Sequence, residues 1–279
     1  MPIHDQGYRR YAGTRAPVGR AWQVIARAGI RTIISKRSFI SLMLFAWAPF
    51  LVRAVQIYAS ANFQQAAFLA PKGETFRDFL DQQGVFVFFV TIWVGAGLIA
   101  NDRRANALQL YLSKPLTAVE YIAGKMAILF LFLVFVTWAP AMGLLIVQTV
   151  FAGSFTFVAN NAYLLPAITL FSLAQVLLAS TTMLALSSLS KSSRFVGVMY
   201  AGLMFFTAAL FQALRGITGS SAFAWISPGD ALEQLGDTIF RLQPRYDLSP
   251  ALAALTVVLL IAGSMYILSR RVKGVEIVT

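Results

Sequence analysis

The sequence predicts an all-α, polytopic integral membrane protein with six transmembrane helices. Of its 279 residues, 58% are hydrophobic and only 12% are charged, whereas about a quarter of the residues of a soluble domain are charged. The apolar residues also occur in blocks of about twenty, which is the length that a helix needs to cross the hydrocarbon core of a bilayer. A third observation is that basic and acidic residues are concentrated in alternate connections between these blocks.

Six segments are long and apolar enough to cross a membrane. The third and fourth exceed about twenty residues, so we expect them to tilt or to extend into the cytoplasm. Pro140 and Pro166 lie within these two segments and predict a kink or a break in each. The predicted spans are Phe39–Tyr58, Gly84–Ala100, Val119–Phe151, Tyr163–Leu189, Phe195–Leu214 and Leu252–Leu268.

The distribution of charge predicts the orientation of the chain. Seventeen of the 23 basic residues lie in the N-terminal segment, the second-to-third and fourth-to-fifth connections and the C-terminus. Because Lys and Arg accumulate on the cytoplasmic side, both termini are expected inside, in a cell (inner or plasma) membrane. The net charge of +12 is thus explained by topology, and no nucleic acid is expected as a partner. Acidic residues gather in the other connections: Glu74, Asp78, Asp81, Asp230, Glu233, Asp237 and Asp247.

The chain divides into a cytoplasmic N-terminus (1–38), a transmembrane domain (39–270) and a short cytoplasmic tail (271–279). Within the transmembrane domain, two connections stand out by length, a cytoplasmic one at 101–120 and an outer one at 215–249. Within the outer connection, residues 220–240 are only moderately apolar and are interrupted by a Pro-Gly pair.

Residues 20–34 have the pattern of an amphipathic helix. Arg20, Arg27 and Arg31 fall on one face, and Trp22, Ala26, Gly29 and Ile33 fall on the opposite face. Such a helix is expected in the inner membrane interface, with its arginines toward anionic lipid headgroups. An ordinary soluble helix is the alternative, but an indole next to a span is typical of an interfacial anchor.

The connection after the second span predicts a short helix with an apolar stripe. Leu108, Tyr111 and Leu112 are spaced i, i+3 and i+4, and Pro115 ends the helix. Thr117 and Glu120 then form a capping-box pattern that starts the third span. The stripe could be buried in the membrane interface or in the groove of a cytoplasmic partner, and the spacing favours neither.

This stretch resembles the type-2 ATP-binding-cassette (ABC) transporter permeases. The match is carried by Asp102, Arg103, Leu110, Tyr111, Leu112, Ser113, Pro115, Glu120, Tyr121, Gly124 and Lys125, and a weaker similarity by Ile226, Ser227 and Pro228. The resemblance implies a permease homodimer with two separate ATPase subunits. It also implies that the short helix is a coupling helix that docks on the ATPase, and that the outer connection 215–249 forms short re-entrant helices that cap the pathway from outside. The moderate apolarity of residues 220–240 is consistent with such helices. The residues expected at this contact are Asp102, Arg103, Arg104, Leu108, Tyr111, Leu112, Lys114 and Glu120.

No catalytic, cofactor or metal site is expected in this chain. The sequence contains no cysteine, and its only histidine is His4, which excludes thiolate catalysis and Cys-ligated metals. A phosphate-binding loop requires Gly-x-x-x-x-Gly-Lys-Ser/Thr, and Gly124-Lys125 is followed by Met126. ATP and Mg²⁺ would therefore bind to the partner ATPase, and this chain is not expected to be an enzyme.

A few residues in the spans are candidates for a transport pathway or a dimer contact. Arg53, Gln175 and Gln212 could line a polar pathway, although snorkelling of the arginine and hydrogen bonds between helices are simpler explanations. Gly197 and Ala201 have the spacing of small residues that permits close helix approach. This approach could occur between two copies of the chain or within one copy.

Two other functions are compatible with the composition. The first is an ATP-independent membrane transporter or channel, and the second is a non-transporting membrane scaffold or assembly factor. The lack of Asp, Glu and His at the centres of the spans argues against a proton-coupled carrier, which needs a titratable group there. Nothing in the sequence selects a substrate.

Overall fold

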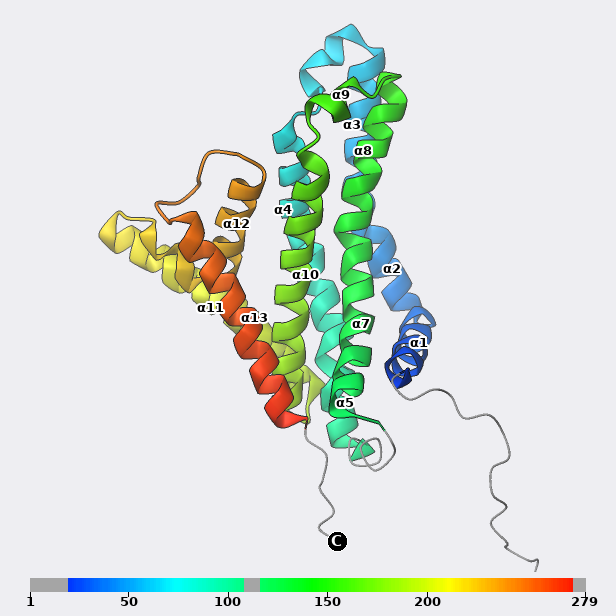
Figure 1. Cartoon of the computed structure of the whole chain (residues 1–279), viewed down its shortest axis with the longest axis vertical. Coiled ribbons are helices and arrows are strands. Elements are labelled where there is room, and N and C mark those ends of the chain that lie inside the picture. Colours follow the sequence, from blue (N-terminus) through cyan, green and yellow to red (C-terminus); the bar gives the residue numbers. More distant parts are fainter. Residues whose placement is uncertain (1–19, 108–115, 273–279) are drawn as a thin grey trace, which may run out of the picture.

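The residues that the computed structural model describes, 20–107 and 116–272, are mostly helical and include no strand. Six helices or helix pairs are long and apolar enough to cross a membrane, which confirms the predicted all-α class and the six spans (Figure 1). The spans are Arg37–Asn62, Gly73–Arg104, Ala118–Ala152, Leu164–Leu189, Ser193–Thr218 and Pro250–Arg271.

The first and third spans are each broken by a proline. In the first span, α2 (Arg37–Ala46) and α3 (Ala48–Asn62) meet at Trp47, two residues before Pro49. In the third span, α7 (Ala118–Val136) and α8 (Trp138–Ala152) meet at Thr137, three residues before Pro140. Proline lacks an N–H and clashes with the carbonyl four residues earlier, so the helix is interrupted at that point. The predicted break at Pro140 is confirmed.

The predicted kink at Pro166 is wrong. The fourth span, α10 (Leu164–Leu189), begins only two residues before this proline. The N–H groups of a first helical turn have no partner within the helix, so proline is tolerated there without distortion. Helix α10 lies centrally among the spans and is more buried than any other of the six (Figure 1).

The second span is longer than predicted. It consists of α4 (Gly73–Val90), a π-helical turn η2 (Thr91–Gly95) and α5 (Ala96–Arg104). The helix begins eleven residues before Gly84, the predicted start, because Phe76, Phe79 and Leu80 are buried in the core. Charged residues alternate with these aromatic and aliphatic residues and lower the mean hydropathy of the start of α4. The segment was therefore not predicted as part of the span, although it is packed inside the protein.

The helices of the molecule meet at two opposite ends, which we name by the charges gathered there (Figure 1). We call the "basic end" the one formed by α1 (Ala21–Ile34), the end of α5 and the end of α13 (Pro250–Arg271). The opposite "acidic end" holds the start of α4 and α12 (Pro228–Ile239). Helices α11 (Ser193–Thr218) and α13 diverge from α10 toward the acidic end. Short elements η1 (Gln64–Leu69), α9 (Thr156–Asn160) and η3 (Ala222–Ile226) connect the spans there.

Candidate functional site

At the basic end, the second and third spans are held together by a three-residue contact that we call the clamp. Asp102 of α5 forms an ion pair with Lys125 of α7, with Oδ2 and Nζ 2.6 Å apart. The hydroxyl of Tyr121 donates to the same carboxylate at 2.7 Å, and its ring is fully buried. The Lys125 ammonium lies 5.4 Å from the centre of that ring. These three residues belong to the resemblance motif, and the clamp gives a physical reason for their types.

A second contact joins α5 to the end of α10. Arg103 donates a hydrogen bond to the carbonyl of Ser188. The buried hydroxyl of Ser187 accepts from the N–H groups of Ile99 (3.2 Å) and Ala100 (3.0 Å) and donates to the carbonyl of Ala96 (2.9 Å). The π-helical turn directly before these residues shifts the pattern of backbone hydrogen bonds at the start of α5. A side-chain hydroxyl such as that of Ser187 can pair with the backbone N–H and C=O groups that lose their partners through this shift. The serine-rich end of α10 was not singled out from the sequence.

The structure describes some of the residues predicted to contact the ATPase but not others. Thr117 and Glu120 form the predicted capping box at the start of α7: the hydroxyl accepts from the Glu120 N–H at 3.2 Å, and the carboxylate accepts from the Thr117 N–H at 3.1 Å. Arg104 is exposed, whereas Arg103 is half-buried. Leu108, Tyr111, Leu112 and Lys114 lie outside the described residues, so the predicted coupling helix stays a prediction.

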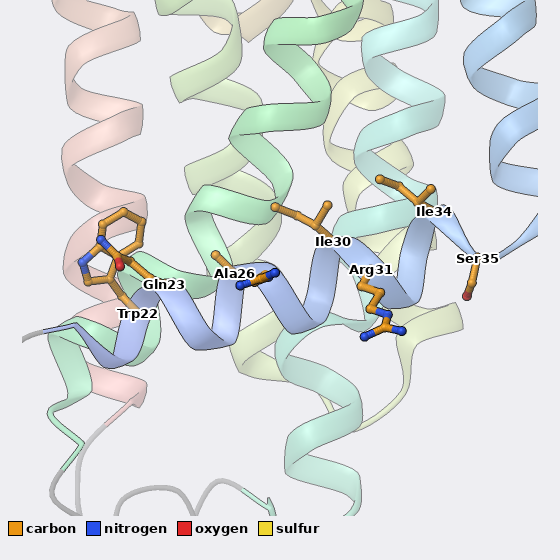
Figure 2. A pocket seen from close by; sticks show the side chains of 8 residues that line it. Trp22, Gln23, Ala26, Ile30, Arg31, Ile34 and Ser35 are labelled. Atoms are coloured by element: carbon orange, nitrogen blue, oxygen red, sulfur yellow. The ribbon is translucent and has the colours of Figure 1, made fainter. Parts of the chain in front are cut away.

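Helix α1 runs across the neighbouring transmembrane helices (Figure 2). Its apolar side chains Trp22, Ala26, Ile30 and Ile34 point toward the side on which the spans lie, and Arg31 points the opposite way (Figure 2). The predicted amphipathic helix is therefore present. A membrane location for it remains a prediction.

Two glycines allow α1 to lie close to α7. A Cβ at Gly124 of α7 would lie 2.9 Å from the carbonyl oxygen of Trp22 and 2.8 Å from Cβ of Ile25. A Cβ at Gly29 of α1 would lie 2.2 Å from the side chain of Ile128. A larger residue at Gly124 would push the two helices apart, because it meets a backbone atom and a Cβ of α1, whereas at Gly29 the end of the Ile128 side chain would have to shift. This explains why a glycine stands at the start of the third span.

At the acidic end, a buried arginine holds α4 to α12. The side chain of Arg77 is fully buried, and its Nε lies 3.2 Å from Oδ1 of Asp237, which is 2% exposed. Arg77 also pairs with Asp81 one turn later and donates to the carbonyl of Glu233 at 3.0 Å. Its guanidinium lies over the ring of Phe171 on α10, 4.4 Å from the ring centre. The sequence analysis missed this residue, although the i, i+4 spacing of Arg77 and Asp81 was a usable signal.

Arg245, in the loop after α12, extends this contact into an ionic network. It lies 2.6 Å from Asp81, 2.9 Å from Asp237 and 3.5 Å from Glu233. Burial raises the pKa of Asp237 and Glu233 above their ordinary values, despite the nearby guanidinium groups. The pKa of Tyr246 is also raised, first by burial and then because its hydroxyl donates to Asp230 at 2.7 Å.

Close approach of α12 to this network depends on Gly236. A Cβ there would lie 2.6 Å from both Nε of Arg77 and Cε2 of Phe171. Beside the network lies a cavity of about 200 Å³, enclosed by α4, α10, α11 and α12. Asp81, Glu233 and Gln175 line it, so one of the predicted pathway residues faces a cavity next to the ionic network.

The other candidate residues of the spans lie elsewhere. Arg53 lines a separate cavity of about 240 Å³ and donates to Gln56 at 3.3 Å, while Gln212 is exposed on α11. The three predicted pathway residues therefore do not share one cavity within a single chain. Gly197 is buried, and a Cβ there would lie 3.2 Å from Ile92 of η2. Ala201 is half-buried. The packing of Gly197 favours an approach within one chain, and a dimer contact at these positions stays a prediction.

No protein-family model matches the chain, and no curated protein matches it either.

Proposed function

We propose that this chain is the membrane-spanning permease subunit of an ATP-binding-cassette transporter, driven by a separate ATPase subunit. The proposal rests on the resemblance of residues 101–125 to type-2 permeases and on the six-span architecture. On this proposal two ATPase subunits bind two copies of the chain, and ATP and Mg²⁺ bind to the ATPase.

The clamp is the observation that best supports mechanical coupling. The segment proposed to dock on the ATPase connects α5 and α7, and Asp102, Tyr121 and Lys125 join these two helices directly beside it. Arg103 and Ser187 join α5 to the end of α10 in the same region. A movement imposed on the connection would therefore be passed to three spans together, as an ATP-driven conformational change requires.

The surroundings of the chain follow from the same proposal. With the basic end in the cytoplasm, α1 would lie at the inner membrane surface, where its apolar side faces the acyl chains and its arginines face anionic headgroups. Helix α11 exposes Phe195, Val198, Phe205, Phe206 and Ile217, a surface that suits lipid or a second copy of the chain. The outer connection would cap the pathway from the opposite side through α12.

Co-purification tests this function. A tagged chain extracted from the membranes of its host in a mild detergent is expected to retain a soluble protein with a phosphate-binding loop, in a 1:1 ratio. The complex should hydrolyse ATP, and the isolated chain should neither bind nor hydrolyse it, because it encodes no phosphate-binding loop. ATP binding by the purified chain alone would contradict the two-component proposal.

A double substitution tests where the ATPase docks. Leu108→Asp with Leu112→Asp should abolish retention of the ATPase, because burial of each leucine contributes about 1.5–3 kcal/mol and a buried carboxylate adds a penalty. Arg104→Glu, at the rim of the same expected contact, should weaken retention much less, since Arg104 is exposed and surface ion pairs contribute about 0–1 kcal/mol. Full retention of the ATPase by the double variant would place the docking surface elsewhere, with α1 as the next candidate.

A further inference from the structure

The cavity at the acidic end combines carboxylates with an apolar interior. Its volume is about 200 Å³, smaller than the roughly 300–1,000 Å³ of sites that hold drug-sized ligands. Asp81 and Glu233 lie on its wall, and the rest of the lining is largely apolar, including Val87, Phe88 and Met204. A ligand here would be a small molecule, or the end of a larger one, with a polar group beside an apolar body.

The charges around the cavity favour a cation. Among the described residues, this network contains four carboxylates but two cationic groups, Arg77 and Arg245. The carboxylates belong to Asp81, Asp230, Glu233 and Asp237. Glu233 lines the cavity and has only long contacts with the network: its Oε2 lies 3.5 Å from Arg245 and 3.2 Å from the hydroxyl of Tyr246. An additional positive charge at the cavity would compensate this excess of carboxylates.

Gln175 gives an independent indication that the ligand carries hydrogen-bond donors. Its side chain is only 7% exposed and lines the cavity. Its Oε1 atom has no hydrogen-bond partner among the described residues. Buried carbonyl oxygens are nearly always paired, so this acceptor fits a donor group that enters the cavity.

We propose that this cavity binds the protonated amine of a small organic cation, with the ammonium group between Glu233 and Gln175 and the apolar body against Val87, Phe88 and Met204. An ammonium supplies a positive charge to pair with Glu233 and an N–H donor for Oε1 of Gln175, and aromatic faces attract cations as well. A metal ion fits less well, because Ca²⁺ and similar ions need six or more oxygen ligands. In the described part of the chain no group of three or more acidic, His or Cys side chains is arranged to hold a metal.

The site has a consequence for transport that rests on the function proposed above. If the chain is a permease, organic amines are its substrate class, because the cavity adjoins the second and fifth spans and the outer helix α12. The binding site itself requires only the purified chain, so it can be tested without the ATPase.

Titration calorimetry on the full chain in lipid nanodiscs tests the site, with 2-phenylethylammonium as the probe and 2-phenylethanol as its neutral counterpart. The ammonium should bind at least about tenfold more tightly, since hydrogen bonds to charged groups are among the strongest in proteins. Gln175→Leu should weaken ammonium binding by about tenfold or more. Gln148→Leu, the same substitution on α8 outside the cavity, should not change it.

A second variant distinguishes loss of the site from misfolding of Gln175→Leu. A Cβ at Gly84 would meet only the Gln175 amide, at 3.6 Å, so Gly84→Leu should fill the cavity and abolish binding without lowering the melting temperature. Equal binding of the two probes, or unchanged binding by Gln175→Leu and Gly84→Leu, would overturn the site. If the ATPase still co-purified in that case, the permease function would stand. Loss of the ATPase with intact amine binding would contradict the permease function alone.

Discussion

Arg77 and Asp237 form a buried ion pair, with Nε and Oδ1 3.2 Å apart, that joins the second span to helix α12. Two further residues extend this ion pair. Asp81 pairs with Arg77, and Arg245 pairs with the carboxylates of both Asp81 and Asp237. Helix α12 is too short to span a bilayer, with 12 residues against the roughly twenty needed. Its position therefore depends on this pair and on its packing against α10 and α13. Any movement of α12 away from α4 must break buried ionic contacts.

We expect Arg77→Met to destabilise the chain strongly. The substitution leaves the carboxylate of Asp237 buried without its partner on α4, and removing one member of a buried ion pair costs about 3–5 kcal/mol. Chemical unfolding of the purified chain in detergent micelles measures the loss. Arg245→Met is the matched control and should cost less, because this side chain is 36% exposed.

The pair can be separated from the rest of the network with a double variant. Arg77→Met combined with Asp237→Leu removes both buried charges, so it should be more stable than Arg77→Met alone. If the double variant were less stable by the sum of both single losses, the two residues would not interact across the helices.

Glu233 predicts how stability depends on pH. Burial raises the pKa of this carboxyl above its ordinary value of 4.5, and the neighbouring Asp81 raises it further. The folded chain therefore holds this proton more tightly than the unfolded chain does, so this contribution favours folding increasingly as the pH falls from neutrality through the raised pKa.

The comparison with Glu233→Gln isolates this effect. The melting temperature of the original chain should rise relative to that of the variant as the pH is lowered from 7 to 5, as followed by the fluorescence of the tryptophans. Glu74→Gln, at an exposed position on α4, controls for the loss of one negative charge. If the melting temperature of the original chain instead fell relative to that of Glu233→Gln as the pH was lowered, Glu233 would be stabilised as a carboxylate.

The six spans could be predicted because blocks of about twenty apolar residues are visible without any knowledge of packing. The break at Pro140 and the capping box at Thr117 depend only on local chemistry, and the structure confirms both. The kink expected at Pro166 was wrong because the effect of a proline depends on its distance from the start of the helix. The predicted start at Tyr163 was only one residue too early, so it already placed Pro166 in the first turn, where proline is tolerated.

The ionic network could not be predicted in the same way. Arg77 and Asp237 are 160 residues apart, and they meet only because Gly236 lets α12 lie against α4 and α10. The charged residues of both segments were assigned to outer loops, since hydropathy cannot distinguish a charge in water from one that is buried with a partner. The clamp residues, in contrast, are close in sequence and were found by motif, although their mutual contacts were not.

Gly124 tests the packing of α1 on α7. Gly124→Leu should displace α1, because even a Cβ would lie 2.9 Å from the carbonyl oxygen of Trp22, and overpacking typically costs about 1–3 kcal/mol. The chain has no native cysteine, so Ala26→Cys reports the contact through its reactivity with a soluble maleimide. Ala26 is buried, so the cysteine of Ala26→Cys should react slowly with the maleimide. It should react faster when Gly124→Leu is present in the same chain. Gly202→Leu on α11, where a Cβ meets nothing within 4 Å, should leave the rate unchanged.

The predicted orientation can be tested with single cysteines at exposed positions. Asp78→Cys and Thr238→Cys lie at the acidic end, and Ala105→Cys and Ser192→Cys at the basic end. In intact cells an impermeant maleimide should label the first pair and not the second, because the basic end is expected in the cytoplasm. Labelling of Ala105→Cys from outside would reverse the orientation.

The clamp predicts a variant that binds the ATPase but is uncoupled from it. Asp102→Ala removes the carboxylate that holds both Lys125 and Tyr121, so α5 and α7 can move separately. The apolar stripe predicted to dock on the ATPase, Leu108, Tyr111 and Leu112, is unchanged. The ATPase should still co-purify in full amount.

The uncoupling should appear in the activity of the reconstituted complex. The amine probe should stimulate the ATPase activity of the original complex, and it should no longer do so in the Asp102→Ala complex. Exchange of the two charges, Asp102→Lys with Lys125→Asp, rebuilds the ion pair in the opposite sense and should restore part of the response, although Tyr121 then loses its acceptor. A response that is unchanged in Asp102→Ala would show that force reaches the spans by another route, for which the contact of Arg103 with Ser188 on α10 is the next to test.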